Sequence, residues 1–147
     1  MGVLADFFVA TPEQAVQYFN CASDDSSEAE RIRNMLNPVE RTGITSLELG
    51  TLWAILAGVD FDDTVHVPED TCVDEDGESW LNELPQGLLS LLVNLSPERL
   101  ETVGAQWART EEIDGDPIVL AELITDLQNL AKAAMREKKS VYLCGSL

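Results

Sequence analysis

The chain has 147 residues, 45% of them hydrophobic, and a formal net charge of −18. This length supports one core and one domain (residues 1–147), and no apolar run approaches the roughly 18 residues of a membrane helix. The excess of acid disfavours nucleic acid and anionic membranes as partners.

The N-terminus and the cysteines indicate a compartment. The N-terminus lacks the basic start and apolar core of a signal peptide. Three widely spaced cysteines, Cys21, Cys72 and Cys144, are an odd number and do not resemble a disulfide framework. We therefore expect a cytoplasmic protein with reduced thiols.

The first elements are a strand and a helix. The apolar run at residues 3–10 predicts a strand that is buried on most sides. A capping residue, a proline and a glutamine follow at residues 11–14 and predict a helix to about Asn20. Its apolar face is expected to bury three residues: Ala15, Val16 and Phe19.

Two more helices are predicted before residue 60. After a polar linker at residues 23–27, a helix at residues 28–36 should end at Asn37-Pro38. Ser46 can cap a third helix, which is apolar most of the way round and reaches a C-terminal cap at Gly58. We expect this helix to be central and buried.

The segment at residues 60–83 carries ten acids and no Lys or Arg. It is predicted to be an exposed acidic loop with one short edge strand at residues 65–67, and Trp80 and Leu81 should return the chain to the core.

The C-terminal half is predicted to be mainly helical. Residues 85–95 fit a buried helix or a strand, and their leucine content favours the helix. Ser96-Pro97 should open the next helix, which ends within residues 111–115. The long helix at residues 116–137 has an Asp cap, a proline in its first turn and an apolar stripe at helical spacing.

Residues 141–144 form a last apolar run that predicts a strand. This strand should pair with the N-terminal one. The expected fold is therefore α+β and mostly helical, with about five or six helices packed on a small sheet.

The order of elements resembles the YfbM-like family of uncharacterised bacterial proteins. Three features carry the resemblance: the Met-Gly start before a strand and helix, the Leu-rich helix with Trp53 followed by Gly58, and the long helix that runs into a terminal apolar strand. The acidic segment after Gly58 has no counterpart in that pattern. The resemblance implies a bacterial, cytoplasmic α+β protein and no functional residue.

Candidate chemistry centres on His66, the only histidine. Cys72 with His66 as base suggests a thiol nucleophile, but dense negative charge disfavours a thiolate. The three cysteines with His66 match a zinc ligand count but contain no C-x-x-C pair. Asp74, Asp76, Gly77 and Glu83 match four positions of an EF-hand loop, yet Cys72 occupies the first, which leaves open only an irregular divalent-cation site.

The sequence contains no common nucleotide-binding or hydrolase motif, so we predict no catalytic residue, metal or cofactor. The leading hypothesis is a non-enzymatic module, similar to an inhibitor or immunity protein, whose acidic face binds a basic protein. The predicted partner-binding residues are Asp62, Asp63, Asp74, Asp76, Glu78 and Trp80. The alternative is a hydrolase or divalent-metal-dependent enzyme that uses carboxylates and His66, and a third interpretation is that the acidic segment only aids solubility.

Overall fold

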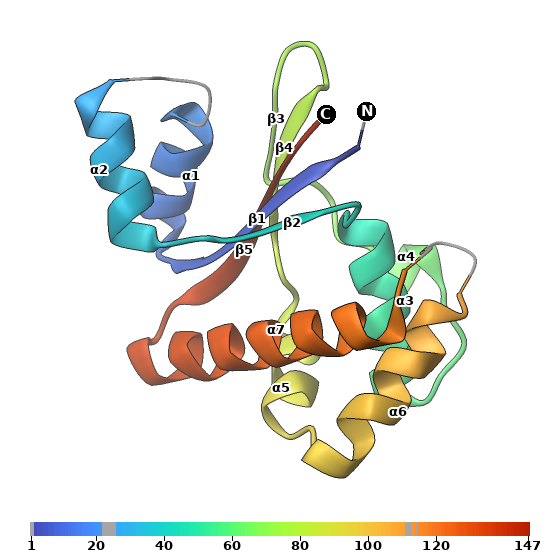
Figure 1. Cartoon of the computed structure of the whole chain (residues 1–147). Helices are drawn as coiled ribbons and strands as arrows, with labels where there is room; N and C mark the ends of the chain where they lie inside the picture. The colour runs from blue at the N-terminus through green and yellow to red at the C-terminus, as the bar shows by residue number, and fades with distance from the viewer. Residues whose placement is uncertain (1, 22–25, 111–112, 114) are drawn as a thin grey trace.

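A computed structural model of the chain describes residues 2–21, 26–110, 113 and 115–147 (Figure 1). Seven helices and five strands lie within these residues. In chain order they are β1 (Leu4–Ala10), α1 (Pro12–Cys21), α2 (Ser27–Leu36), β2 (Val39–Thr42), α3 (Ser46–Ala57), α4 (Asp63–His66), β3 (Cys72–Val73), β4 (Ser79–Glu83), α5 (Gln86–Val93), α6 (Pro97–Ala108), α7 (Pro117–Glu137) and β5 (Ser140–Ser146).

The strands form one antiparallel sheet in the order β2-β1-β5-β4-β3. The predicted pairing of the terminal strands is confirmed, because β1 and β5 pair along their whole length, from Leu4 opposite Ser146 to Ala10 opposite Ser140. These two strands form the centre of the sheet, and the α+β class with helices on a sheet is confirmed.

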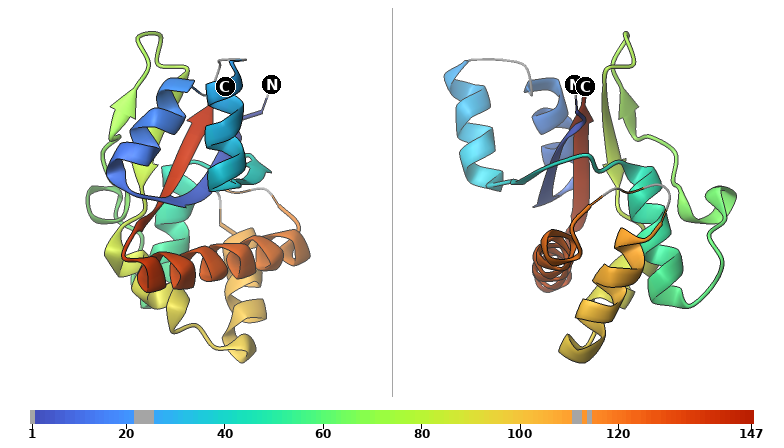
Figure 2. Two further views of the ribbon diagram at one scale, coloured as in Figure 1. Left: turned by 90° about the vertical axis from the view of Figure 1, so that its left-hand side faces the viewer. Right: turned by 45° about the vertical axis from the view of Figure 1, so that its right-hand side comes forward.

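Helices cover both faces of the sheet (Figures 1 and 2). Phe7 points into the larger core, which α3, α5, α6 and α7 build on one face. Its neighbour Phe8 points into a smaller core under α1 and α2 on the other face. Both side chains are fully buried, which explains the nearly continuous apolar run of β1.

Helix α7 follows its prediction closely. The Asp116 carboxylate accepts a hydrogen bond from the N–H of Ile118 at 2.8 Å, and Pro117 occupies the first turn. Lys138 ends the helix in the left-handed conformation, with φ of 57°. Six residues of the apolar stripe are buried: Leu120, Leu123, Ile124, Leu127, Ala131 and Ala134.

Two local predictions need correction. The cap of α3 is Thr45 and not Ser46, because the side chain of Glu48 accepts from the N–H of Thr45 at 3.0 Å and closes a capping box. In α1, Tyr18 is buried where Val16 was expected, and Val16 is exposed. The tyrosine lies on the inner face because its hydroxyl bonds to the sheet.

The acidic segment is more structured than predicted. Residues 65–67 were predicted to be an edge strand, but Val65 and His66 belong to the one-turn helix α4, capped by Asp62. The rest of the expected loop contains the hairpin of β3 and β4, and β2 is a further strand that was not predicted.

The predicted linker at residues 23–27 falls largely outside the described residues, and α6 ends at Ala108, before the end predicted within residues 111–115. Across the described ranges, no helix combines the length and the apolar character that crossing a bilayer requires.

Candidate functional site

The β3–β4 hairpin presents the densest group of the predicted binding residues. Its strands pair Cys72 with Leu81 and Val73 with Trp80. The turn is closed by a 2.9 Å hydrogen bond from the N–H of Gly77 to the carbonyl of Asp74. Gly77 has a φ of 69°, a conformation that favours glycine. The hairpin extends the sheet at the end where both termini lie (Figure 1).

The acids of this hairpin face solvent. The side chains of Asp74, Glu75, Asp76 and Glu78 are all exposed. The ion pairs between described residues, Arg41–Asp126 and Lys139–Glu137, include none of them. Their charge is therefore available to a partner. It also protects the short edge strand β3 from pairing with other chains, which is its simplest structural role.

Trp80 lies at the base of the hairpin, and its indole packs over a glycine of the neighbouring strand. It pairs across the strands with Gly145 of β5, and a Cβ built on Gly145 would lie 2.7 Å from Cζ2 of the indole. The ring therefore occupies the space above the glycine. Val73, its partner on β3, shares this face and is 54% exposed. The hairpin thus combines an acidic tip with an accessible apolar pair.

Asp62 and Asp63 lie elsewhere, at the start of α4, which packs against α3. The Asp62 carboxylate accepts bonds from the N–H of Thr64 at 3.0 Å and from its hydroxyl at 2.6 Å. These bonds to the charged form lower the pKa of Asp62. Asp62 therefore has a local structural role, and the six predicted residues occupy two places and not one face.

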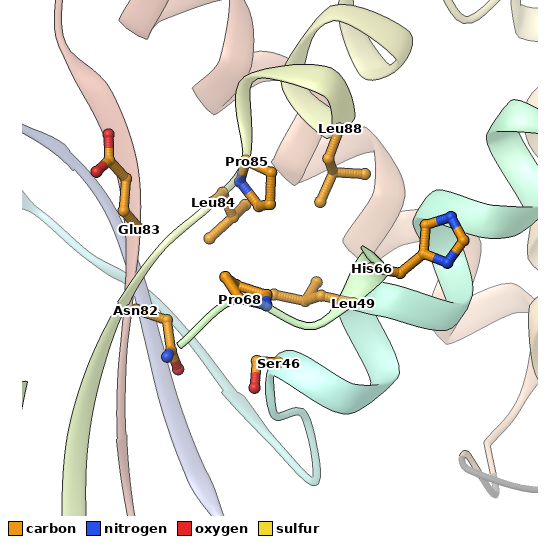
Figure 3. A pocket seen from close by; sticks show the side chains of 9 residues that line it. All are labelled: Ser46, Leu49, His66, Pro68, Asn82, Glu83, Leu84, Pro85 and Leu88. Carbon is orange, nitrogen blue, oxygen red and sulfur yellow. The ribbon is translucent and has the colours of Figure 1, made fainter. Parts of the chain in front are cut away.

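His66 is buried among aromatic rings. Its Nδ1 accepts a hydrogen bond from the N–H of Asp62 at 3.0 Å. The ring meets Trp53 edge-on with centroids 5.2 Å apart and stacks on Phe61 at 5.9 Å. The pocket beside it has a volume of about 10 Å³ and one acid in its lining, Glu83, which points away (Figure 3). Among the residues that the structure describes, His66 is not gathered with two carboxylates in a cleft.

The cysteines lie on the other side of the sheet from the larger core. All three are free, Cys144 is buried in the smaller core, and Cys21 and Cys72 pack against it. Burial, with a smaller contribution from the charge of Asp6, raises the pKa of Cys144 to about 12. This thiol is therefore a poor nucleophile, and Cys72 packs with it and not with His66.

The metal-binding patterns do not assemble into a coordination sphere. No group of three or more His, Cys, Asp or Glu suited to a metal occurs among the described residues. The EF-hand pattern is instead a hairpin: Asp74 and Asp76 lie at its turn, and Glu83 lies at the far end of β4.

Sequence analysis missed a polar hollow on the face of the smaller core, with a volume of about 380 Å³. Asp6 and Glu40 are paired across β1 and β2 in its lining. The hydroxyl of Tyr18 donates to Asp6 at 2.6 Å. The signal in the sequence was Asp6, the single acid within the apolar run at residues 3–10.

Comparison with known proteins gives one structural likeness. No protein-family model matches the sequence, and no curated protein matches it. Among solved structures, YfbM from Escherichia coli, a protein of unknown function, is similar over 100% of both chains, with a TM-score of 0.43 and 13% sequence identity. This likeness assigns no role to any residue.

Proposed function

We propose that this protein is a non-enzymatic binding module that docks a basic partner protein on the β3–β4 hairpin. The observation that carries the proposal is the arrangement of the hairpin. Four exposed acids, which form no ion pair with another described residue, surround the turn, and an accessible apolar pair lies at its base.

The acids would mainly speed the encounter. Charges of one sign on a projecting hairpin attract a basic surface over about 8–10 Å at physiological salt. Such attraction raises association rates and selects for charge, whereas exposed ion pairs add little affinity each. Binding should therefore weaken as salt concentration rises.

The affinity would come from Trp80 and Val73. Partly exposed tryptophans are the commonest anchors of protein interfaces, especially where a polar rim surrounds them. The glycine at position 145 holds the indole in one place, so little side-chain entropy would be lost on binding. Asp62 and Asp63 would contribute only long-range attraction, because they lie on α4.

The experiment is affinity capture from lysate of the source organism at low salt, followed by titration of the captured protein. Three variants are compared with the wild type. One neutralises the tip (Asp74→Asn, Asp76→Asn, Glu78→Gln), one removes the anchor (Trp80→Ala), and a control neutralises three exposed acids on helices (Glu30→Gln, Glu101→Gln, Glu122→Gln).

We expect a basic partner whose affinity falls at least about tenfold in the tip and anchor variants. The control carries the same change in net charge and should bind nearly as well as the wild type. If the tip variant and the control bound the partner equally well, the acids of the hairpin would act only through the net charge of the protein and not as a docking site. Affinity that is insensitive to salt and to all three variants would overturn the proposal.

A further inference from the structure

The polar hollow on the face of the smaller core extends over four strands. Its volume is about 380 Å³, within the roughly 300–1,000 Å³ that is usual for pockets that bind small molecules. Every residue of its lining belongs to β2, β1, β5 or β4, which are successive neighbours in the sheet. Three strand spacings of about 4.8 Å make the hollow about 14 Å across. Both termini lie at this end of the sheet (Figure 1).

The pairing of the strands places the lining side chains in two rows, because residues two apart on a strand point to the same face. The first row crosses β2, β1 and β5 as Glu40, Asp6 and Cys144. The second row consists of one leucine and three residues with hydroxyls: Thr42, Leu4, Ser146 and Ser79. Two carboxylates therefore lie at one corner of the hollow, and the rest of it offers hydroxyls and apolar contact.

The two carboxylates lie in a position where like charges repel. Asp6 and Glu40 are directly opposite each other on adjacent strands, which is destabilising for two acids. Neither forms an ion pair with another described residue. The basic residue in the lining, Arg41, bonds instead to Asp126 of α7 and to the carbonyl of Glu40. A cation bound between the two acids would replace this repulsion by attraction.

An organic cation suits this site better than a metal ion. The described part of the chain holds no group of three or more His, Cys, Asp or Glu suited to a metal, and two carboxylates alone supply too few oxygen ligands for a divalent ion. A guanidinium is planar and weakly hydrated, and its several N–H donors can bond to two carboxylates at once. The bond from the Tyr18 hydroxyl to Asp6, at 2.6 Å, holds one of these carboxylates in place.

We propose that the hollow binds an alkylguanidinium, with its head between Asp6 and Glu40 and its aliphatic stem over Leu4 and Cys144. The inference is independent of the proposed function, because Trp80 lies on the opposite face of β4 from the residues that face the smaller core. The same head group belongs to free small molecules and to the arginine side chain of a partner protein. The experiment must therefore separate these two sources.

The experiment is a nuclear magnetic resonance titration of the isotope-labelled protein with butylguanidine. Butylurea, an uncharged molecule of nearly the same shape, is the matched control ligand. We expect saturable shifts of backbone amides centred on Asp6, Glu40 and Cys144, and binding of butylurea at least about tenfold weaker. A blocked Gly-Arg-Gly peptide separates the sources: tighter binding than that of butylguanidine indicates an arginine side chain, and weaker binding indicates a free small molecule.

Two double variants test the residues. Asp6→Asn with Glu40→Gln removes both charges, and the new amide can still accept the bond from Tyr18. Glu98→Gln with Glu101→Gln makes the same change in net charge at exposed positions of α6. We expect the dissociation constant of butylguanidine to rise at least about tenfold in the first variant and less than about twofold in the second.

Glu40→Gln alone changes an exposed side chain and keeps the test decisive if the double variant does not fold. It should raise the dissociation constant about threefold to tenfold. Equal binding by the variants of the hollow and the α6 control would overturn the inference. Equal binding of butylurea and butylguanidine, or shifts centred on the tip of the β3–β4 hairpin, would also overturn it.

Discussion

Replacing Gly145 by alanine tests whether the Trp80 indole fills the space that the glycine leaves open. Gly145 is buried in β5 with an extended backbone that accepts any residue, and alanine is favoured over glycine in a strand by about 0.5–1 kcal/mol. The new Cβ would, however, overlap the indole ring. Overpacking of this kind costs about 1–3 kcal/mol, so we expect a net loss of about 1 kcal/mol.

A double-mutant cycle with Trp80→Ala isolates this overlap. Without the indole, Gly145→Ala should instead stabilise the protein by about 0.5 kcal/mol, because only the gain in strand propensity remains. Urea unfolding followed by far-ultraviolet circular dichroism measures all four proteins without relying on tryptophan fluorescence. If Gly145→Ala changed the free energy of unfolding equally with and without the indole, the absence of a side chain at position 145 would not be what makes room for Trp80.

Three further variants test the core. Burial raises the pKa of Cys144 from 9.0 to about 12, so the native state keeps this thiol protonated at a pH where the unfolded chain loses the proton. The resulting stabilisation is complete below pH 9 and is lost as the pH rises from 9 towards 12, so the free energy of unfolding of the wild type should fall by about 1 kcal/mol between pH 9 and 10. Urea titrations of Cys144→Ala should lack this decrease. Trp107→Phe should cost about 2 kcal/mol, since the indole N–H donates to the carbonyl of Glu48 at 3.0 Å within the core, and a loss below about 0.5 kcal/mol in urea unfolding would contradict that role. Gln128→Ala should cost about 1–2 kcal/mol, because its amide donates to the carbonyls of Leu92, in the last turn of α5, and of Leu95, just after it. Unchanged thermal and urea midpoints would show that solvent replaces both bonds.

The elements with a strong local signal could be predicted from sequence. Helix α7 has its cap, proline and apolar stripe within one segment, and β1 and β5 are dense apolar runs. Local chemistry determines these elements, and burial only reinforces them. The pairing of β1 with β5 followed because each needed a strand beside it.

The hairpin and α4 depend on contacts that sequence periodicity does not show. Strand β3 has two residues and exists because β4 lies beside it. Helix α4 fits closely against α3 where Gly50 leaves room, since a Cβ there would lie 2.9 Å from the carbonyl oxygen of His66. The predicted binding residues all lie on one segment of the sequence, but their division between α4 and the hairpin could not be read from charge alone.

The central position of β1 and β5 also sets the order in which the chain can fold. The two strands that hold the sheet together, β1 and β5, are far apart in the sequence, so the sheet cannot close until β5 has left the ribosome. Until then β1 and β4 both expose open edges and apolar side chains such as Phe8. A nascent chain in this state is prone to aggregate, and a large excess of negative charge keeps such chains apart while they wait for the final strand.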